Sequence, residues 1–267
     1  MAQRLLIIGC GNMGGAMLTG WLAAGQDPAR FAVLDPALAA APEGVALYRD
    51  AGEAAAAGGF AAVLLGFKPQ QLAALAPGLA ALCGPGVTVH SLLAGITLAQ
   101  LAAAFPGAAA HVRVMPNLAA AIGKSPVILA EQGLDEAGRT GVFALFAQLG
   151  TALWLADEAQ FDLVTALAGS GPGFVYRFID ALAAAAAALG LERGLADHLA
   201  LAMVEGAAAL AARADAPPAT LADRVASPGG MTREGLNVLD NEAALVTLMT
   251  KTLQATRDKG AALSQHS

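Results

Sequence analysis

The chain has few residues that can carry metal, redox or polyanion chemistry. Of its 267 residues only two are cysteine, four are histidine and 13% are charged. Cys10 and Cys83 have no second cysteine close to them, so they predict neither a metal motif nor a redox motif, and we expect both to act as small hydrophobic residues. The net charge is −6 and no cluster of Lys or Arg occurs, which argues against binding to nucleic acid.

One long segment lacks charge altogether. No Lys, Arg, Asp or Glu occurs between Lys68 and Arg113, which raises the question of a membrane span. The segment is interrupted by helix-breaking and polar residues, namely Pro69, Gln70, Gln71, Pro77, Gly84, Pro85 and Gly86. We therefore expect a soluble chain with no membrane partner. A strand-like run begins by Leu5, leaving no room for a signal peptide, so we expect a cytoplasmic protein.

Apolar sequence, by contrast, is abundant, at 57% of the chain. In the first half, strand-like runs with few polar residues alternate with helical runs. The strand-like runs are 5–9, 31–34, 61–67, 87–91, 111–115 and 126–130, and the helical runs are 13–24, 70–82, 98–105 and 135–149. Strands of this kind, spaced by helices, predict a sheet buried on both faces, in a doubly wound, Rossmann-like α/β domain.

After Trp154 the pattern becomes helical. Apolar residues recur at helical spacing in 159–167, 173–189, 195–212, 234–239 and 242–259. We therefore place a domain boundary near Asp157, between a dinucleotide-binding domain (1–157) and an all-helical domain (158–267). The segment 174–189 is too apolar for a helical domain of this size to hide, which predicts a homodimer at least.

The sequence Gly9-Cys10-Gly11-Asn12-Met13-Gly14, here called the glycine turn, lies between a strand-like and a helical run. That context makes the Gly-x-Gly-x-x-Gly pattern typical of a dinucleotide site. Gly9 permits the tight turn, Gly11 allows the pyrophosphate to approach the backbone, and Gly14 allows the helix to pack closely on the strand. A glycine-rich turn without a ligand is the simpler alternative.

Asp35 follows the run 31–34 and lies 21 residues after Gly14. A carboxylate at this place accepts hydrogen bonds from the ribose hydroxyls and repels a 2′-phosphate. No Arg or Lys adjoins it in the sequence, so we expect NADH to be favoured over NADPH. The alternative is that Asp35 and Pro36 only start a turn.

Two further turns end strand-like runs, at 66–70 and 91–95. The carboxyl ends of parallel strands line the ligand crevice of an open sheet, so both turns should flank the cofactor. The expected contacts from them are Phe67, Lys68, Pro69, Leu92, Leu93 and Ala94. A solvated surface position is the alternative for Lys68.

The stretch Ser227-Pro228-Gly229-Gly230-Met231-Thr232, here called the SPGG loop, precedes a helix that we expect to begin at Glu234. Free backbone N–H groups next to the positive end of a helix favour a small carboxylate. An ordinary turn between helices is the alternative. In Gly169-Ser170-Gly171-Pro172, Ser170 or Gly171 is expected to cap a helix whose first position is Pro172, as an alternative to facing the substrate.

The glycine turn, Gly169-Ser170-Gly171-Pro172 and the SPGG loop together resemble the signature set of pyrroline-5-carboxylate reductases, the last enzymes of proline biosynthesis. The resemblance spans almost the whole chain and implies reduction of 1-pyrroline-5-carboxylate to L-proline with NADPH or NADH. By this resemblance the substrate carboxylate would be held by Ser227, Gly230, Met231 and Thr232. The Thr232 hydroxyl would lie near the ring nitrogen as the catalytic candidate, and Glu158 would help to position that nitrogen. A solvated glutamate at the start of a helix is the alternative for Glu158. The sequence departs from the family pattern at Leu118, Ala168 and Met231.

Two alternatives to imine reduction follow from the same pattern. The β-hydroxyacid dehydrogenases resemble the chain in the glycine turn, but they carry a catalytic lysine early in the second domain. Here no lysine lies between residues 125 and 250. A nucleotide-sensing protein without turnover would not need a second anion site. Reduction of a protonated C=N needs mainly positioning, and we expect each site to combine the glycine turn and Lys68 of one subunit with the SPGG loop of the other.

Overall fold

The computed structural model describes residues 4–264, which divide into two compact units. The first comprises residues 4–169 together with 256–264, and the second comprises residues 170–255. The first unit contains the sheet and the glycine turn, and the second contains the SPGG loop.

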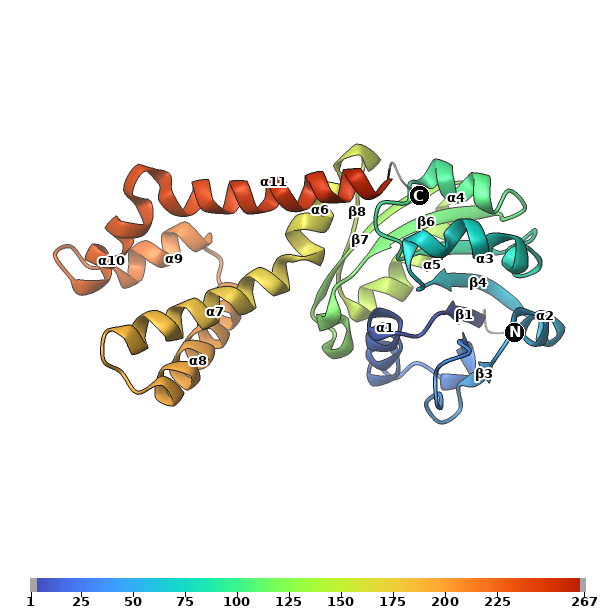
Figure 1. Cartoon of the computed structure of the whole chain (residues 1–267), viewed down its shortest axis with the longest axis horizontal. Coiled ribbons are helices and arrows are strands. Elements are labelled where there is room, and N and C mark those ends of the chain that lie inside the picture. The colour runs from blue at the N-terminus through green and yellow to red at the C-terminus, as the bar shows by residue number, and fades with distance from the viewer. Residues whose placement is uncertain (1–3, 265–267) are drawn as a thin grey trace. The chain divides into compact units, whose positions relative to one another are not determined.

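The first unit is built on a single eight-stranded sheet in the described part of the chain, with the order β3-β2-β1-β4-β5-β6-β7-β8 (Figure 1). The strands are β1 (Arg4–Ile8), β2 (Phe31–Leu34), β3 (Ala46–Tyr48), β4 (Phe60–Leu65), β5 (Thr88–Ser91), β6 (Ala110–Met115), β7 (Ser125–Gln132) and β8 (Gly150–Trp154). Neighbouring strands are parallel except β6 and β7, which are antiparallel. Because the chain moves from β1 to β2 on one side and later to β4 on the other, the strand order reverses at β1 and β4, where such sheets bind ligands.

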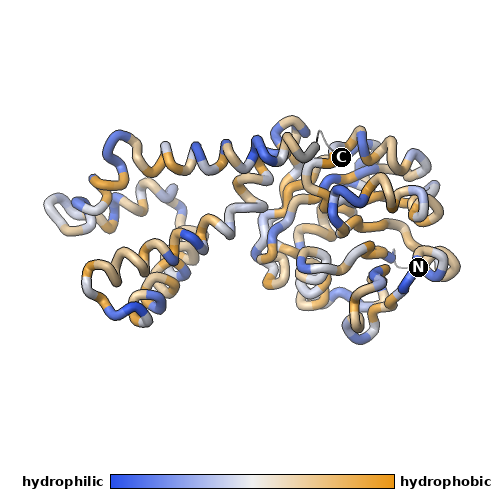
Figure 2. The backbone as a smooth tube through the Cα atoms, in the orientation of Figure 1, coloured by the Kyte–Doolittle hydropathy of each residue, from blue (hydrophilic) through white to orange (hydrophobic). Residues whose placement is uncertain are grey.

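Helices cover both faces of this sheet. They are α1 (Asn12–Ala23), α2 (Ala51–Ala57), α3 (Leu72–Leu79), α4 (Leu98–Ala104), α5 (Glu136–Phe146) and the short α6 (Phe161–Val164). On one face Trp21 of α1 and Phe146 of α5 pack with Ile7, and on the other Leu72 of α3 packs with Leu6. Figure 2 shows the strands as largely hydrophobic, as expected for a sheet covered on both faces. The predicted doubly wound α/β class is confirmed.

Three elements of this unit have no counterpart among the predicted runs. β3 has three half-buried residues at the sheet edge, and α2 is almost all alanine, so neither has a strong apolar period. β8 is a second edge strand, and only Ala152 in it is fully buried. Short edge elements bury few side chains, which is why their sequence signal is weak.

The second unit is helical, as expected, and consists of α7 (Gly171–Ala188), α8 (Arg193–Ala211), α9 (Pro218–Val225), α10 (Met231–Asp240) and the first part of α11 (Ala244–Ser264). α7 and α8 form a hairpin whose core is made by three alanines, Ala183, Ala196 and Ala200 (Figure 1). Small side chains let the two helices approach closely.

The outer faces of α7 and α8 leave large apolar side chains exposed, among them Phe178, Leu199 and Met203. Among residues 4–264, α8 is also the one helix that is long and apolar enough to cross a membrane, and only 11% of its apolar stretch is buried inside the chain. An apolar helix of a soluble assembly passes the same test. Continuous exposed apolar surface of this kind marks an interaction site.

Candidate active site

The glycine turn begins directly after β1 and leads into α1. Gly9 has a φ of +85°, and a Cβ there would lie 3.0 Å from the Phe67 nitrogen. A Cβ on Gly14 would lie 2.8 Å from the Gly9 oxygen, whereas one on Gly11 would have no atom within 4 Å. Gly9 and Gly14 are therefore required by the packing of the turn itself. The space above Gly11, at the N-terminus of α1, is open for a ligand.

The carboxylate of Asp35 is fixed against the glycine turn. Its Oδ2 accepts a hydrogen bond of 2.8 Å from the Cys10 N–H, and its Oδ1 accepts bonds from the Ala37 and Leu38 N–H groups at 2.9 and 3.2 Å. Asp35 is thus both a turn residue and a neighbour of the proposed cofactor site. With three of about four acceptor positions used, one position on Oδ2 remains for a ribose hydroxyl.

Both cysteines are buried thiols, as expected. Burial raises the pKa of Cys10, and the neighbouring Asp35 carboxylate raises it further. Burial raises the pKa of Cys83 to about 12. Both thiols therefore stay protonated at neutral pH and have no nucleophilic role.

Arg49 is a residue of this site that the sequence did not reveal. It follows β3, the edge strand beside β2, and its Nη1 donates to the backbone oxygens of Asp35 (3.2 Å), Pro36 (3.4 Å) and Leu38. Its Nη2 donates to the Ala39 oxygen at 3.2 Å. The expectation that no cation accompanies Asp35 holds along the sequence but is wrong in space, because the pairing of β2 with β3 brings Arg49 to the loop after β2.

The turns after β4 and β5 lie next to the glycine turn. Gly66 donates from its N–H to the Ile8 oxygen at 2.8 Å, and a Cβ at Gly66 would overlap the Gly9 carbonyl oxygen. The Leu92 N–H donates to the Leu65 oxygen at 3.0 Å, which ties the turn after β5 to the end of β4. The three turns therefore share one edge of the sheet, as predicted.

The residues expected to contact the cofactor from these two turns differ in exposure. Lys68 is exposed, and its N–H donates to Gln71 Oε1 at 3.0 Å at the start of a short 3-10 turn. Phe67, Pro69, Leu92 and Ala94 are half-buried. The Leu93 side chain is buried in the core on the face opposite α1, so only its backbone is free to meet a ligand at this edge.

The SPGG loop is a tight turn that runs directly into α10. The Gly230 N–H donates to the Ser227 oxygen at 2.9 Å, Gly229 has a φ of +72°, and Pro228 precedes it, as is typical of a type II turn. A Cβ on Gly230 would lie 2.6 Å from the Ser227 Oγ. It would also lie 3.1 Å from the Ser227 carbonyl oxygen, so a side chain at position 230 would force the serine hydroxyl to rotate and would crowd the turn.

The expected start of the following helix at Glu234 is wrong, since α10 begins at Met231 with Gly230 as its N-cap. Met231 and Thr232 therefore occupy the first turn, where backbone N–H groups have no partner inside the helix. Among residues 4–264, no acceptor is recorded for either N–H or for the Thr232 hydroxyl. Both residues are exposed, so these donors are accessible to a ligand.

A further cation, Arg233, stabilises this loop. Its Nη2 donates to Asp223 Oδ1 of α9 at 2.7 Å and to the Ala226 oxygen at 3.5 Å. The ion pair fixes the end of α9 to the start of α10. The charge of Arg233 is compensated by Asp223, so the positive end of the α10 dipole is what favours an anion here.

Glu158 is engaged in a network of the first unit. Its Oε1 accepts bonds of 2.8 Å from the Leu98 N–H and from Arg113 Nη1, while Arg113 stacks 3.8 Å above the centre of the Phe161 ring. Burial lowers the pKa of Arg113, and Glu158 and Asp162 oppose that shift. These bonds account for Glu158 without a substrate, so its proposed contact with the ring nitrogen stays a prediction.

The Gly169-Ser170-Gly171-Pro172 segment joins a π-helical turn (Thr165–Gly169) to α7. Ser170 occupies the N-cap position, as expected, but α7 begins at Gly171 rather than Pro172, and Ser170 has helical angles and no side-chain capping bond. The π-helical turn continues into α7, which leaves the Ser170 hydroxyl without a capping role. Asn117 Nδ2 donates to the Ala168 oxygen at 3.0 Å and so supports the π-helical turn.

Comparison with known proteins identifies the family. A family model described as pyrroline-5-carboxylate reductase dimerisation matches residues 158–263. The chain is 32% identical to pyrroline-5-carboxylate reductase of Pseudomonas aeruginosa, over 98% of this chain and 97% of that protein. The chain belongs to the pyrroline-5-carboxylate reductase family. The enzyme of Escherichia coli is 33% identical, over 95% of this chain and 97% of that one.

Solved structures agree with this membership. A pyrroline-5-carboxylate reductase from Coxiella burnetii has a TM-score of 0.90 at 28% identity and covers 99% of both chains. The Plasmodium falciparum enzyme, solved with NADP bound, has a TM-score of 0.83 at 23% identity and covers 98% of both chains, which shows the shared fold. The resemblance and the two-part fold class expected from the sequence are confirmed. The relatives are named for the predicted function, the reduction of pyrroline-5-carboxylate. The chain is thus an oxidoreductase of proline biosynthesis.

The match to a dimerisation domain also bears on the exposed faces of α7 and α8. Both helices lie inside the matched segment. Their exposed apolar side chains are the type of surface that a second copy covers. The predicted self-association through the helical half is supported, whereas the domain boundary near Asp157 stays a prediction.

Proposed function

We propose that this chain reduces 1-pyrroline-5-carboxylate to L-proline with NADH or NADPH, as a soluble cytoplasmic homodimer or larger homo-oligomer. The observation that carries the proposal is that a chain of this family contains two separate sites that can each bind an anion. One is the open space over Gly11 for a pyrophosphate, and the other is the start of α10 for a small carboxylate. No nucleic acid or membrane partner is part of the proposal.

The first site fits a dinucleotide. A Cβ at Gly11 would fill the space where a pyrophosphate meets the N-terminus of α1, and no protein atom fills it. Asp35 retains one acceptor position for a ribose hydroxyl, and the turns at 66–70 and 91–95 flank the same edge. When bound, the nicotinamide supplies a hydride.

The second site fits the carboxylate of the substrate. The N–H groups of Met231 and Thr232 are free donors at the positive end of α10, and the ion pair between Arg233 and Asp223 fixes this end of the helix. Because the contact is through the backbone, methionine at position 231 is compatible with it. Ser227 adds a hydroxyl next to Gly230.

The reaction needs little from protein side chains beyond this binding. A hydride adds to the ring carbon of the protonated C=N, and the π electron pair moves to nitrogen, which becomes a neutral amine. No base is required to remove a proton from an alcohol, in agreement with the lack of lysine between residues 125 and 250. We assign the Thr232 hydroxyl to hydrogen bonding with the ring nitrogen, which orients the C=N carbon for attack.

For the cofactor, we propose that NADH is preferred. The Asp35 carboxylate is held against the glycine turn by the Cys10 N–H, where it would meet a 2′-phosphate directly. Arg49 donates to four backbone oxygens of the same loop, and its charge reduces the repulsion without abolishing it. Asp35 therefore decides which of the two cofactors is preferred, and Arg49 affects how strong the preference for NADH is.

The direct experiment is to follow NADH and NADPH oxidation with and without 1-pyrroline-5-carboxylate, using folded protein. Cofactor oxidation that depends on the imine supports the proposal, and its absence with both cofactors contradicts it. Thr232→Val should lower kcat by at least tenfold, Thr232→Ser should retain most of it, and Ser170→Ala should have a smaller effect than Thr232→Val. Equal losses in Thr232→Val and Ser170→Ala would remove Thr232 from the mechanism.

A further inference from the structure

A cavity of about 400 Å³ lies at the sheet edge opposite the glycine turn. It is lined by the first residues of several strands, including Arg4 of β1, Phe31 of β2 and Thr88 of β5, and by one side of α5 from Ala137 to Leu145. The turns proposed for the cofactor follow the other ends of the same strands. The cavity is therefore separate from the proposed active site, and its volume lies in the range of small-molecule sites.

His90 of β5 gives this cavity an unsatisfied polar group. Its side chain is 2% exposed and packs edge-on against Phe146, with ring centres 5.2 Å apart. Its Nδ1 is buried and has no hydrogen-bond partner among residues 4–264. Burial lowers the pKa of His90 to about 4, so the ring is neutral at physiological pH. A buried ring nitrogen without a partner is costly. Because Nδ1 itself has almost no accessible surface, a ligand in the cavity would have to displace neighbouring atoms slightly to reach it.

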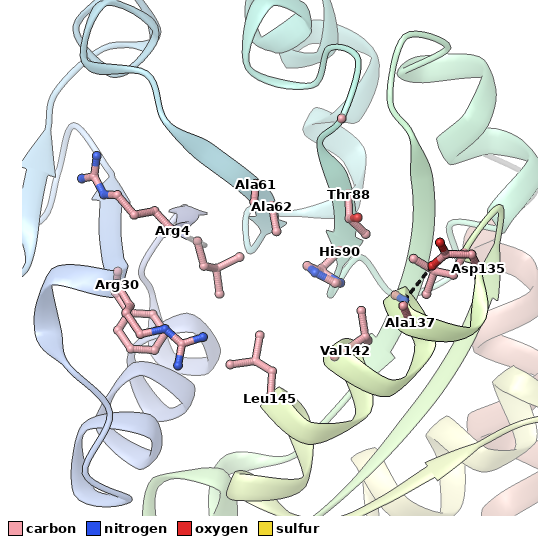
Figure 3. Close-up of a pocket in the computed structure, with 16 residues that line it drawn as sticks. Arg4, Arg30, Ala61, Ala62, Thr88, His90, Asp135, Ala137, Val142 and Leu145 are labelled. Carbon is pink, nitrogen blue, oxygen red and sulfur yellow. Dashed lines mark hydrogen bonds between the residues drawn. The ribbon is translucent and has the colours of Figure 1, made fainter. Parts of the chain in front are cut away.

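The charged groups lie on opposite walls. Figure 3 shows Arg4 and Arg30 on one side, Asp135 on the other and His90 between them. The Arg30 side chain points into the cavity, bonds to Gln26 and forms no ion pair in the described part of the chain. The Arg4 guanidinium points away, toward the Gly58 oxygen at 3.4 Å and the Phe60 ring at 4.8 Å. Arg30 is thus the cation available to a ligand.

Apolar side chains separate Arg30 from the polar far end. Ala62, Val142 and Leu145 line this middle part, and Thr88 and His90 lie beyond them (Figure 3). Asp135 Oδ1 accepts the Gly138 N–H at 2.7 Å as the cap of α5, and its negative charge disfavours a second anionic group at that end. The order along the cavity is therefore cation, apolar surface and neutral hydrogen-bonding groups.

We propose that this cavity binds an organic acid with a single carboxylate at Arg30, an apolar body, and a hydroxyl or similar group that faces Thr88 and His90. Such a site would serve regulation or stability rather than catalysis, because it lies at the wrong edge of the sheet for the reaction. The proposal does not depend on the proposed reductase activity.

The test is calorimetric titration of the full chain, saturated with NADH, using para-hydroxyphenylacetate as the probe. We expect saturable binding that NADH does not displace. Tyrosol, which replaces the carboxylate by an alcohol, should bind at least tenfold more weakly, and phenylacetate, which lacks the ring hydroxyl, should bind severalfold more weakly. The imidazole nitrogen resonances of His90 should shift only with probes that carry the hydroxyl.

Variants locate the probe. Arg30→Gln should weaken binding at least tenfold, whereas the matched Arg4→Gln should change it by less than twofold. Ala62→Met fills the middle of the cavity and should abolish binding, with thermal unfolding confirming that each variant is folded. No saturable binding to the wild type, equal losses in the two arginine variants, or displacement of the probe by NADH would each overturn the proposal.

Discussion

Replacing Asp35 by serine tests the contact that is proposed to set cofactor preference. In the structure the carboxylate accepts three backbone hydrogen bonds and keeps one acceptor position for a ribose hydroxyl. A charge-assisted hydrogen bond contributes about 1.5–3 kcal/mol. A carboxylate and a dianionic phosphate roughly 5 Å apart, screened as in water, repel each other by about 1.7 kcal/mol. Together these terms favour NADH by on the order of 100-fold or more before Arg49 is considered.

Arg49 acts against part of this preference. Its guanidinium contacts the backbone of the Asp35 loop, so its attraction for a 2′-phosphate offsets part of the carboxylate's repulsion. We therefore expect Asp35→Ser to lower the ratio of kcat/KM for NADH over NADPH by at least tenfold. Arg49→Gln should raise the same ratio, because it removes the cation and retains the carboxylate.

The assay is steady-state kinetics with both cofactors at saturating imine, and thermal unfolding to confirm that the loop change leaves the variants folded. Asp27→Ser is the matched control, since Asp27 also accepts a local backbone N–H, from Ala29 at 2.9 Å, but precedes β2. The control should leave the ratio unchanged. A wild type that prefers NADPH, together with an unchanged ratio in Asp35→Ser, would refute the reasoning and leave Asp35 as a turn residue only.

Three further predictions concern packing and titration. Gly66→Ala places a methyl group on the turn after β1, so we expect a loss of about 1–3 kcal/mol in unfolding free energy and a raised KM for the cofactor. Its control Gly78→Ala, in α3 with open space around it, should leave the KM unchanged and should not lower the unfolding free energy. Gly230→Ala should raise the KM for the imine and leave the KM for the cofactor unchanged. The control is Gly235→Ala, because a Cβ at Gly235 has no neighbouring atom within 4 Å; equal effects of the two substitutions on the imine KM would contradict the role of the SPGG loop. The pKa of His90 is lowered to about 4 in the folded protein, whereas a histidine in the unfolded chain has a pKa of about 6.5. As the pH falls from 6.5 toward 4, the unfolded chain therefore binds a proton that the folded protein does not bind, and the free energy of unfolding decreases. Chemical denaturation should show a loss of roughly 3 kcal/mol over that window that is absent from His90→Leu, and the same pH slope in both proteins would disprove it.

The parts of the fold that the sequence predicts are those whose signal is local. β1 and β4 are almost continuous apolar runs that a glycine follows directly, and α1 follows the Gly-x-Gly-x-x-Gly spacing. Gly66 and Gly9 are brought together because strands that neighbour each other in a parallel sheet end at the same edge. For these elements, burial on both faces makes the pattern unambiguous.

The parts that the sequence does not predict depend on long-range contacts. Arg49 reaches the Asp35 loop only because β3, a strand of three residues, pairs with β2 at the sheet edge. The start of α10 at Met231 is set by the turn between Ser227 and Gly230, while the apolar period from Glu234 onward shows only the later part of the helix. His90 gives no sequence signal, because its isolation depends on Phe146 and the cavity beside it.

The central claim is that this chain transfers a hydride from a nicotinamide cofactor to the imine carbon of 1-pyrroline-5-carboxylate. It is tested most directly by supplying NADH that carries deuterium at the transferred position and analysing the product by mass spectrometry and NMR. The account predicts L-proline with one deuterium on the ring carbon next to nitrogen that is not bonded to the carboxylate, formed in a one-to-one ratio with oxidised cofactor. Unlabelled proline, or no consumption of cofactor when the imine is added to folded protein, would contradict it.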